Sequence, residues 1–193
     1  MVRRELRGPR FEREEPSLRA ELDHLAPSFR SALCAAAEAY ERVGVRYALI
    51  GGVAVGAYSA PRATRDVDFL VGDEAFTGGS VVSFVPGIPI EAYGVPIDTI
   101  PIPVEYRQLY VRVLDERMES DEPSANGFVQ IASPTLLAVT KVAGGRPRDI
   151  TSVVEMMQAD TVDPDELERL VAPYEKLRIA CGRALREYED VET

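Results

Sequence analysis

The sequence predicts an α+β fold, in which a mixed or mostly antiparallel β-sheet is flanked by helices and followed by a helical C-terminal region. Two observations favour this fold. Apolar residues recur every three or four positions near both ends of the chain, as they do in amphipathic helices. Between these regions, short apolar or alternating segments are separated by glycines, which is typical of strands joined by turns. This order of elements is that of a sheet with segregated helices.

The N-terminal helical pattern covers residues 17–43. Its apolar positions follow steps of three and four from Leu18 onward, so one face of the helix is expected to be buried. Pro27 removes a backbone donor and is expected to interrupt or restart the helix. Gly44 is expected to end it, because glycine readily adopts the left-handed conformation of a C-terminal cap.

The middle of the chain reads as a series of short strands. Residues 47–50 are apolar and run into Gly51-Gly52, after which residues 53–58 predict a short helix. Residues 66–71 alternate polar and apolar side chains and predict a second strand. Further strands are expected at residues 81–85, 88–92, 95–102 and 128–131.

The C-terminal region predicts three helices. Ser133-Pro134 combines a hydroxyl N-cap with proline at the first helical position, which is a strong start signal. Residues 150–157 place apolar side chains on one helical face. Asp163 begins a third helix with an acidic first turn, and Pro173 is expected to kink it.

Length and composition predict one principal domain. With 193 residues, of which 46% are hydrophobic and 28% charged, the chain resembles an ordinary globular protein with one sizeable core. Residues 1–16 are rich in Arg and Glu and are expected to form a flexible charged arm. The α/β domain is assigned to residues 17–160, and residues 161–193 are assigned to a C-terminal helix that packs on the same domain.

The sequence predicts a cytoplasmic protein. No apolar run approaches the roughly 20 residues that cross a bilayer. The basic N-terminus is not followed by the apolar segment of a secretory signal. Cys34 and Cys181 lie in helical apolar patterns and are expected to be buried free thiols.

The net charge of −10 constrains the partners. Proteins that bind duplex DNA over a broad surface usually carry a basic face, because phosphate neutralisation supplies much of the affinity. No duplex-DNA or membrane partner is therefore expected. The acidity weighs modestly against a large RNA and does not disfavour a nucleotide.

Asp66-Val67-Asp68 is the strongest chemical signal in the chain. Residues two apart on a strand face the same side, so both carboxylates are expected to project together. Two such carboxylates repel each other unless a cation lies between them, and Mg²⁺ prefers oxygen ligands of this kind. The alternative is a solvated strand face, for which aspartate is a poor choice because it is depleted in strands.

Glycines and cationic residues flank this carboxylate pair. Gly51-Gly52 lies between a strand and a helix, where it would let an anion approach the backbone N–H groups, although two glycines after a strand more often form a plain turn. Arg62, Thr64 and Arg65 directly precede the carboxylates. They are expected to contact phosphate or the acidic site, the alternative being a polar loop.

Together these residues resemble the signature of the nucleotidyltransferase superfamily, and most closely its minimal branch that contains the AbiEii-like toxins of bacterial toxin–antitoxin systems. In that family Gly-Gly or Gly-Ser is followed, after a spacer, by two carboxylates one residue apart, and a third carboxylate lies on a later strand. The resemblance continues through residues 131–137 to Lys141 and then to Arg146-x-Arg148-Asp149. It covers roughly residues 46–158.

The resemblance implies a nucleotidyltransferase fold and metal-binding carboxylates. Asp66 and Asp68 would ligate Mg²⁺ or Mn²⁺, as two ions. The third carboxylate is expected at Asp98, with Glu91 as the alternative on the neighbouring strand. These three aspartates are also the predicted catalytic residues.

The resemblance also implies a nucleotide-binding set. Two glycines would cradle the triphosphate of a nucleoside triphosphate, and a lysine would neutralise its β- or γ-phosphate with an arginine assisting. The predicted residues are Gly51, Gly52, Arg62, Thr64, Arg65, Lys141 and Arg148. One departure is Ser152, which stands where the family often has an acidic residue.

The implied reaction transfers a nucleoside monophosphate from the triphosphate to a hydroxyl and releases pyrophosphate. Two metal ions would flank the displacement, and the third carboxylate would hold or deprotonate the acceptor hydroxyl. The acceptor is expected to be RNA, such as a tRNA end, or a protein, and an antitoxin protein is a candidate partner. Two alternatives remain: a non-catalytic module that keeps the fold to bind nucleotide or a partner, and an unrelated α+β protein with a structural Asp-Val-Asp.

Overall fold

A computed structural model describes residues 17–77 and 83–191 of the chain as an α+β protein built around a mixed six-stranded sheet. The strands are β1 (Tyr47–Ile50), β2 (Val67–Val71), β3 (Glu91–Ala92), β4 (Val95–Ile100), β5 (Met118–Ser124) and β6 (Gly127–Ile131). The helices are α1 (Leu18–His24), α2 (Pro27–Arg42), α3 (Gly51–Tyr58), α4 (Arg107–Asp115), α5 (Pro134–Gly144), α6 (Pro147–Gln158), α7 (Pro164–Val171) and α8 (Glu175–Val191). Short 3₁₀ turns occur at Asp73–Ala75 and Val104–Tyr106.

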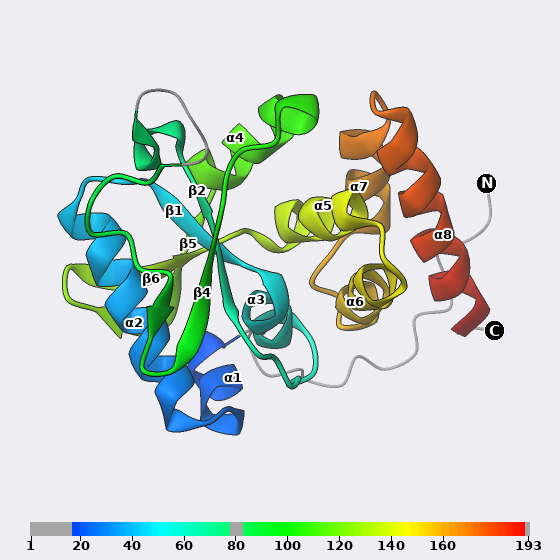
Figure 1. The fold of residues 1–193 in the computed structure, drawn as a ribbon. Coiled ribbons are helices and arrows are strands. Elements are labelled where there is room, and N and C mark those ends of the chain that lie inside the picture. The colour runs from blue at the N-terminus through cyan, green and yellow to red at the C-terminus, as the bar shows by residue number, and fades with distance from the viewer. Residues whose placement is uncertain (1–16, 78–82, 192–193) are drawn as a thin grey trace.

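The sheet has the strand order β3-β4-β2-β1-β6-β5. β1 pairs antiparallel with β2 and parallel with β6, and β2 pairs parallel with β4. Hairpins add β3 and β5 antiparallel at the two edges. In Figure 1, α2 lies on one side of this sheet and the helices α5 to α8 gather on the other side. The prediction of an α+β fold with a mixed sheet and helical C-terminal region is confirmed.

The N-terminal helices form where the sequence predicts them. The Ser17 hydroxyl accepts a hydrogen bond from the Ala20 backbone N–H and so caps α1. α2 begins at Pro27, which fits the first turn of a helix because its missing N–H has no intrahelical partner there. The predicted interruption at Pro27 is therefore a restart.

The strands of the middle region are shorter than the sequence predicts. The strand expected at residues 95–102 ends at Ile100, because Pro101 cannot donate a ladder hydrogen bond. The strand expected at 88–92 is reduced to Glu91–Ala92 and follows Pro89. Residues 81 and 82 lie outside the described residues, and in the remainder of the strand expected at 81–85 Phe84 makes only an isolated bridge to Phe76.

Two elements were not predicted from the sequence. Apart from Met118 and Pro123, β5 is polar, and its buried residue is the charged Glu122, so it shows no apolar alternation. It lies at a sheet edge, where Pro123 is tolerated. α4 buries Leu109, Tyr110, Val113 and Leu114. These positions follow helical spacing, which is the sequence signal of this helix.

The C-terminal helices follow the predicted start and stop signals. Gly145 ends α5 in the left-handed conformation, with φ of 64°. Pro173 divides the third predicted helix into α7 and α8, and the Asp163 side chain caps α7 by accepting from the Asp165 N–H. Buried side chains from Leu18 to Ala184 form one hydrophobic cluster, so α8 shares its core with the sheet.

Other expectations concern the whole chain. The arm predicted at residues 1–16 lies outside the described residues. No helix within residues 17–77 and 83–191 is both long and apolar enough to span a membrane. Cys34 and Cys181 are free thiols, and only Cys181 is fully buried.

A buried carboxylate on α1 leads to a first testable prediction. Glu21 is 1% exposed, and within the described residues its Oε2 atom has no hydrogen-bond partner. Gly56 of α3 makes room for it, since a Cβ there would lie 2.2 Å from the Glu21 Cδ atom. Burial raises the pKa of Glu21 above its ordinary value of 4.5, against the weaker opposing effects of the Arg62 N–H and of the His24 and Arg62 charges.

We expect Glu21→Gln to stabilise the protein at pH 7 by about 1 kcal/mol or more. Because the pKa of Glu21 is raised, the folded protein binds more protons than the unfolded chain above pH 4.5. The contribution of Glu21 to the free energy of unfolding is therefore most favourable below that pH and decreases as the pH rises. Urea unfolding at pH 4 and pH 7 measures this difference. Glu168→Gln, at an exposed site on α7, is the matched control, and an equal gain in both variants would contradict the prediction.

Candidate active site

The predicted carboxylates lie on, or directly before, the neighbouring strands β2 and β4. Asp68 of β2 and Asp98 of β4 are direct register partners in the parallel pair, so their side chains lie on the same face of the sheet. Asp66 immediately precedes β2, and its Oδ1 atom accepts a hydrogen bond of 3.1 Å from the Thr64 hydroxyl. The charges of both Asp66 and Asp98 act on Asp68 and raise its pKa.

Glu91, the alternative third carboxylate, lies one strand farther away. It belongs to the edge strand β3, where its register partner is Pro96, and its side chain is exposed. Asp98 is the closer of the two to Asp68 in the strand order. The register therefore favours Asp98 as the third member of the predicted set.

The Gly-Gly turn brings the N-terminus of α3 against Asp68. Gly51 has φ of 76°, and a Cβ built on it would lie 1.8 Å from the Asp68 Oδ2 atom. The Gly52 backbone N–H donates a hydrogen bond to the Asp68 carboxylate, which favours its charged form. A Cβ on Gly52 would lie 3.0 Å from the Thr64 hydroxyl oxygen. Both glycines thus allow a helix terminus to approach the carboxylates closely, which side chains would prevent.

Asp68 is held in an unfavourable environment for an anion. Burial is the largest cause of its raised pKa, which reaches about 6, and the charges of Asp66 and Asp98 add to it. Lys141 and the Gly52 N–H act in the opposite direction without compensating fully. A clustered, incompletely neutralised set of carboxylate oxygens fits a divalent cation such as Mg²⁺.

The carboxylates do not form a complete metal site by themselves. In the part of the chain that the structure describes, no group of three His, Cys, Asp or Glu side chains lies close enough to hold an ion. Mg²⁺ is commonly held by one or two carboxylates together with substrate phosphates. The donor set therefore fits an ion that arrives with a phosphate-bearing ligand.

Lys141 faces the carboxylates from α5. Its side chain is 13% exposed, and Nζ lies 3.8 Å from Oδ1 of Asp149, which is itself buried at the start of α6. Burial lowers the pKa of Lys141, whereas the charges of Asp149 and Asp68 raise it. The lysine therefore stands between the carboxylate on the sheet and the one on the helix.

Two residues at the start of α6 take part in this arrangement although they were given no role from the sequence. Arg146 caps α6, and its Nε atom lies 2.6 Å from Asp149 Oδ2. The hydrogen bond with Asp149 is the main cause of the raised pKa of Arg146, and the charges of Asp68 and Asp66 contribute as well. Both residues belong to the Arg-x-Arg-Asp stretch that the sequence singled out, so their position in that motif was the available signal.

The remaining predicted cations differ in their surroundings. Arg65 and Arg148 are exposed, and neither side chain forms a hydrogen bond or ion pair within residues 17–77 and 83–191. Arg62 is already engaged: its Nη1 atom donates to the Ser152 hydroxyl at 2.6 Å, and its Nη2 atom lies 3.1 Å from Glu155 Oε2. Two predicted phosphate ligands are thus unpaired, and one is bound to α6.

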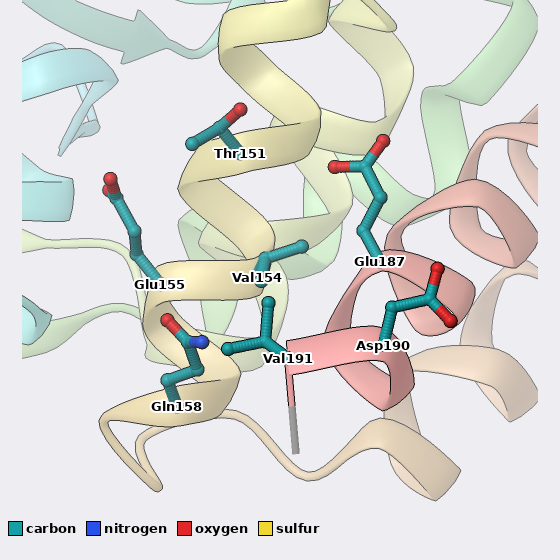
Figure 2. A pocket seen from close by; sticks show the side chains of 7 residues that line it. All are labelled: Thr151, Val154, Glu155, Gln158, Glu187, Asp190 and Val191. Atoms are coloured by element: carbon teal, nitrogen blue, oxygen red, sulfur yellow. The ribbon is translucent and has the colours of Figure 1, made fainter. Parts of the chain in front are cut away.

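Two hollows of the surface lie away from the carboxylates. A hollow of about 460 Å³ lies between α6 and α8, and Figure 2 shows the side chains that line it. Its lining residues are Thr151, Val154, Glu155, Gln158, Glu187, Asp190 and Val191. A second hollow, of about 610 Å³, lies beside Tyr47, at the opposite end of β1 from the Ile50–Asp68 pair. Neither lining includes a predicted site residue, so the candidate site is argued from the residues themselves.

Comparisons with known proteins bear on the fold. No protein-family model matches the sequence, and no curated protein matches it. In structure the chain is similar to an antigenic nucleotidyltransferase-like protein from Paracoccidioides brasiliensis, with a TM-score of 0.51 and 15% sequence identity. The match covers 86% of this chain and 91% of that one. At this identity the likeness shows the fold alone, so the chain has a nucleotidyltransferase-like fold, and the AbiEii-like branch rests on the sequence resemblance.

Proposed function

We propose that the protein is a metal-dependent nucleotidyltransferase that moves a nucleoside monophosphate from a nucleoside triphosphate to a hydroxyl group. The observation that carries the proposal is the position of Asp68. It lies between Asp66 and Asp98, against the N-terminus of α3, and opposite Lys141. On a nucleotidyltransferase-like fold, this combination of clustered anions and nearby cations suits the binding of a metal–triphosphate complex.

Asp66, Asp68 and Asp98 would hold Mg²⁺ or Mn²⁺, as two ions. When bound, the ions would lower the pKa of the attacking hydroxyl and stabilise the negative charge of the departing pyrophosphate. Thr64 supports this function indirectly, because its hydrogen bond to Asp66 orients that carboxylate. The Gly52 N–H does the same for Asp68.

The nucleotide would lie between the sheet and the C-terminal helices. Gly51 and Gly52 let the α3 terminus pack closely against Asp68 and Thr64, so that phosphate oxygens bound to an ion at Asp68 would lie near this terminus. Lys141 would neutralise the β- or γ-phosphate, and the exposed Arg65 and Arg148 would contact the phosphates from the solvent side. These three cationic side chains would favour a triphosphate at this site although the net charge of the chain is −10.

The residues of the chain also suit the transfer step. The acceptor oxygen would form a bond to the α-phosphorus while the bond from that phosphorus to the oxygen bridging to the β-phosphate breaks. Asp98, which is exposed, would accept the proton of the acceptor hydroxyl. The pyrophosphate would leave toward Lys141, whose charge would compensate the charge that develops on the leaving group.

The acceptor and the biological setting follow from the resemblance. RNA, such as a tRNA end, and protein are the two acceptor classes that we propose, and the toxin branch implies a toxin that is paired with an antitoxin protein. The alternative is a non-catalytic module that binds nucleotide or a partner on the same fold. Turnover distinguishes the two functions.

Transfer of label tests the proposal directly. Each α-³²P nucleoside triphosphate would be incubated, with Mg²⁺ or Mn²⁺, with total RNA, bulk protein or small aminoglycoside-like acceptors. We expect label to enter one acceptor class and to be lost in Asp66→Ala and Asp68→Ala. Asp165→Asn, at an exposed position on α7, is the control. Metal-dependent nucleotide binding without transfer to any acceptor would favour the binding module instead.

Lys141→Met provides a second test, since its effects on stability and on binding are expected to differ. The lysine is largely buried and its ammonium group is disfavoured there, so an apolar side chain of similar length should leave stability unchanged or raise it by about 1 kcal/mol. Asp149 keeps its contact with Arg146. Affinity for a metal–triphosphate complex should fall by about tenfold or more.

Chemical unfolding and calorimetric titration would measure the two effects of Lys141→Met. Lys176→Met is the control, because that lysine is 77% exposed on α8 and pairs with Glu105. Unchanged nucleotide affinity in Lys141→Met would remove the lysine from the proposed site.

A further inference from the structure

Arg62 connects the loop before the carboxylate pair to α6. Its guanidinium group contacts Ser152 and Glu155, which lie three residues apart on one face of the helix. The Ser152 hydroxyl in turn donates a hydrogen bond of 2.8 Å to the Arg148 carbonyl oxygen. The Arg62 side chain is only 24% exposed. This two-point contact requires the planar fork of arginine, which a lysine does not offer.

The backbone of Arg62 is held as well. Its N–H group points to Oε1 of the buried Glu21 on α1, at 3.4 Å. Pro61 precedes it and restricts the chain further. Arg62 is therefore fixed from two sides, by α1 through its backbone and by α6 through its side chain.

Both ends of this connection carry residues of the candidate site. The loop continues from Arg62 to Thr64 and Asp66. α6 begins directly after its N-cap Arg146, and Asp149 in its first turn pairs with Lys141. Burial lowers the pKa of the Lys141 ammonium group, and the positive charge of Arg62 lowers it further. The separation between carboxylates and cations thus depends on how α6 is attached to the loop.

We propose that Arg62 is a positioning residue that clamps α6 to the carboxylate loop and thereby sets the width of the nucleotide site, instead of contacting the nucleotide itself. This inference rests on the proposed function for its effect on binding. Its structural part, the coupling of Arg62 to Glu155, does not depend on that function. Ser152 belongs to the same clamp, because it accepts a hydrogen bond from Arg62. This is a structural role for the serine that stands where the nucleotidyltransferase family often has an acidic residue.

A double-mutant cycle with Arg62→Met and Glu155→Gln tests the clamp. The ligand would be Mg²⁺ with the α,β-methylene analogues of the four ribonucleoside triphosphates, which do not turn over at the α-phosphate. We expect each single variant to weaken binding by about tenfold, and the double variant to be no weaker than either, because Glu155 acts on the ligand only through Arg62. Arg62→Lys should not restore binding, since it keeps the charge but loses the fork. Glu168→Gln is the matched control on α7.

A phosphate contact by Arg62 predicts a different pattern. Glu155→Gln would then free the guanidinium and leave binding unchanged or tighter, while Arg62→Met would weaken it. That result, or unchanged binding in both single variants, would overturn the clamp.

Unfolding measurements separate the clamp from the proposed function. Each single variant should lower Tm by about 2–4 °C, and the double variant by less than the sum. Additive shifts would contradict the clamp. A wild-type protein that binds none of the analogues would instead count against the nucleotidyltransferase function, and the unfolding cycle would still decide whether the clamp exists.

Discussion

Asp68→Asn is expected to lower nucleotidyl transfer by at least about 10³-fold while making the protein more stable. The loss follows from removing the charge that the proposed metal ions need. The gain follows from the raised pKa of Asp68, about 6 against an ordinary 3.8, which reflects burial and the charges of Asp66 and Asp98. The folded protein therefore binds more protons than the unfolded chain between these two values, and stability is lost as the pH rises through them. Removing the charge should stabilise the protein by on the order of 1–3 kcal/mol at pH 7 in the absence of divalent ions.

The stability effect of Asp68→Asn gives a readout that does not depend on activity. Unfolding would be measured with EDTA and with Mg²⁺, because an ion that binds the folded state raises stability by mass action. We expect Mg²⁺ to stabilise the wild-type protein more than Asp68→Asn. The Asn carbonyl still accepts from the Gly52 N–H, so the turn should be retained. A variant that is less stable than wild type in EDTA would show that Asp68 is a structural carboxylate and not a member of a strained anionic cluster.

Gly51→Ala is expected to be the most destabilising single substitution near the site, with a cost of about 3 kcal/mol or more. Two causes add. The first is backbone strain, because φ at Gly51 is 76° and side chains disfavour that conformation by about 1 kcal/mol. The second is overlap, since the new Cβ would lie 1.8 Å from Asp68 Oδ2 and would have to displace either the carboxylate or the start of α3.

Gly94→Ala separates these two causes. Gly94 has φ of 74°, nearly that of Gly51, but a Cβ there would meet no atom within 4 Å. The difference between the two variants in urea unfolding therefore measures the close approach of the Gly51 turn to Asp68. Equal costs would mean that the turn is not packed against the carboxylate, and the proposed geometry would be wrong. Transfer activity should fall with Gly51→Ala and remain with Gly94→Ala.

Much of the fold could be predicted from local patterns. The restart at Pro27, the stop at Gly145 and the cap at Asp163 follow from properties of single residues and their neighbours. The polar edge strand β5 could not be predicted in this way, because its pairing is decided by β6 and not by its own side chains. α4, in contrast, has buried residues at helical spacing, so its existence follows from a local pattern.

The candidate site shows the same division. The sequence by itself predicted a carboxylate pair at the start of a strand, because the period of a strand is a property of the local backbone, and glycines beside a short helix. In the structure Asp66 directly precedes β2, and α3 begins at Gly51. Only the tertiary structure decided that Asp98 and not Glu91 lies beside Asp68, since that depends on the register of two strands about thirty residues apart. It also decided that Arg62 is bound by α6 and that Arg146 faces the carboxylates. The range of each interaction is the physical reason: backbone geometry acts over neighbouring residues, whereas ion pairs and strand register form between segments that meet only in the folded chain.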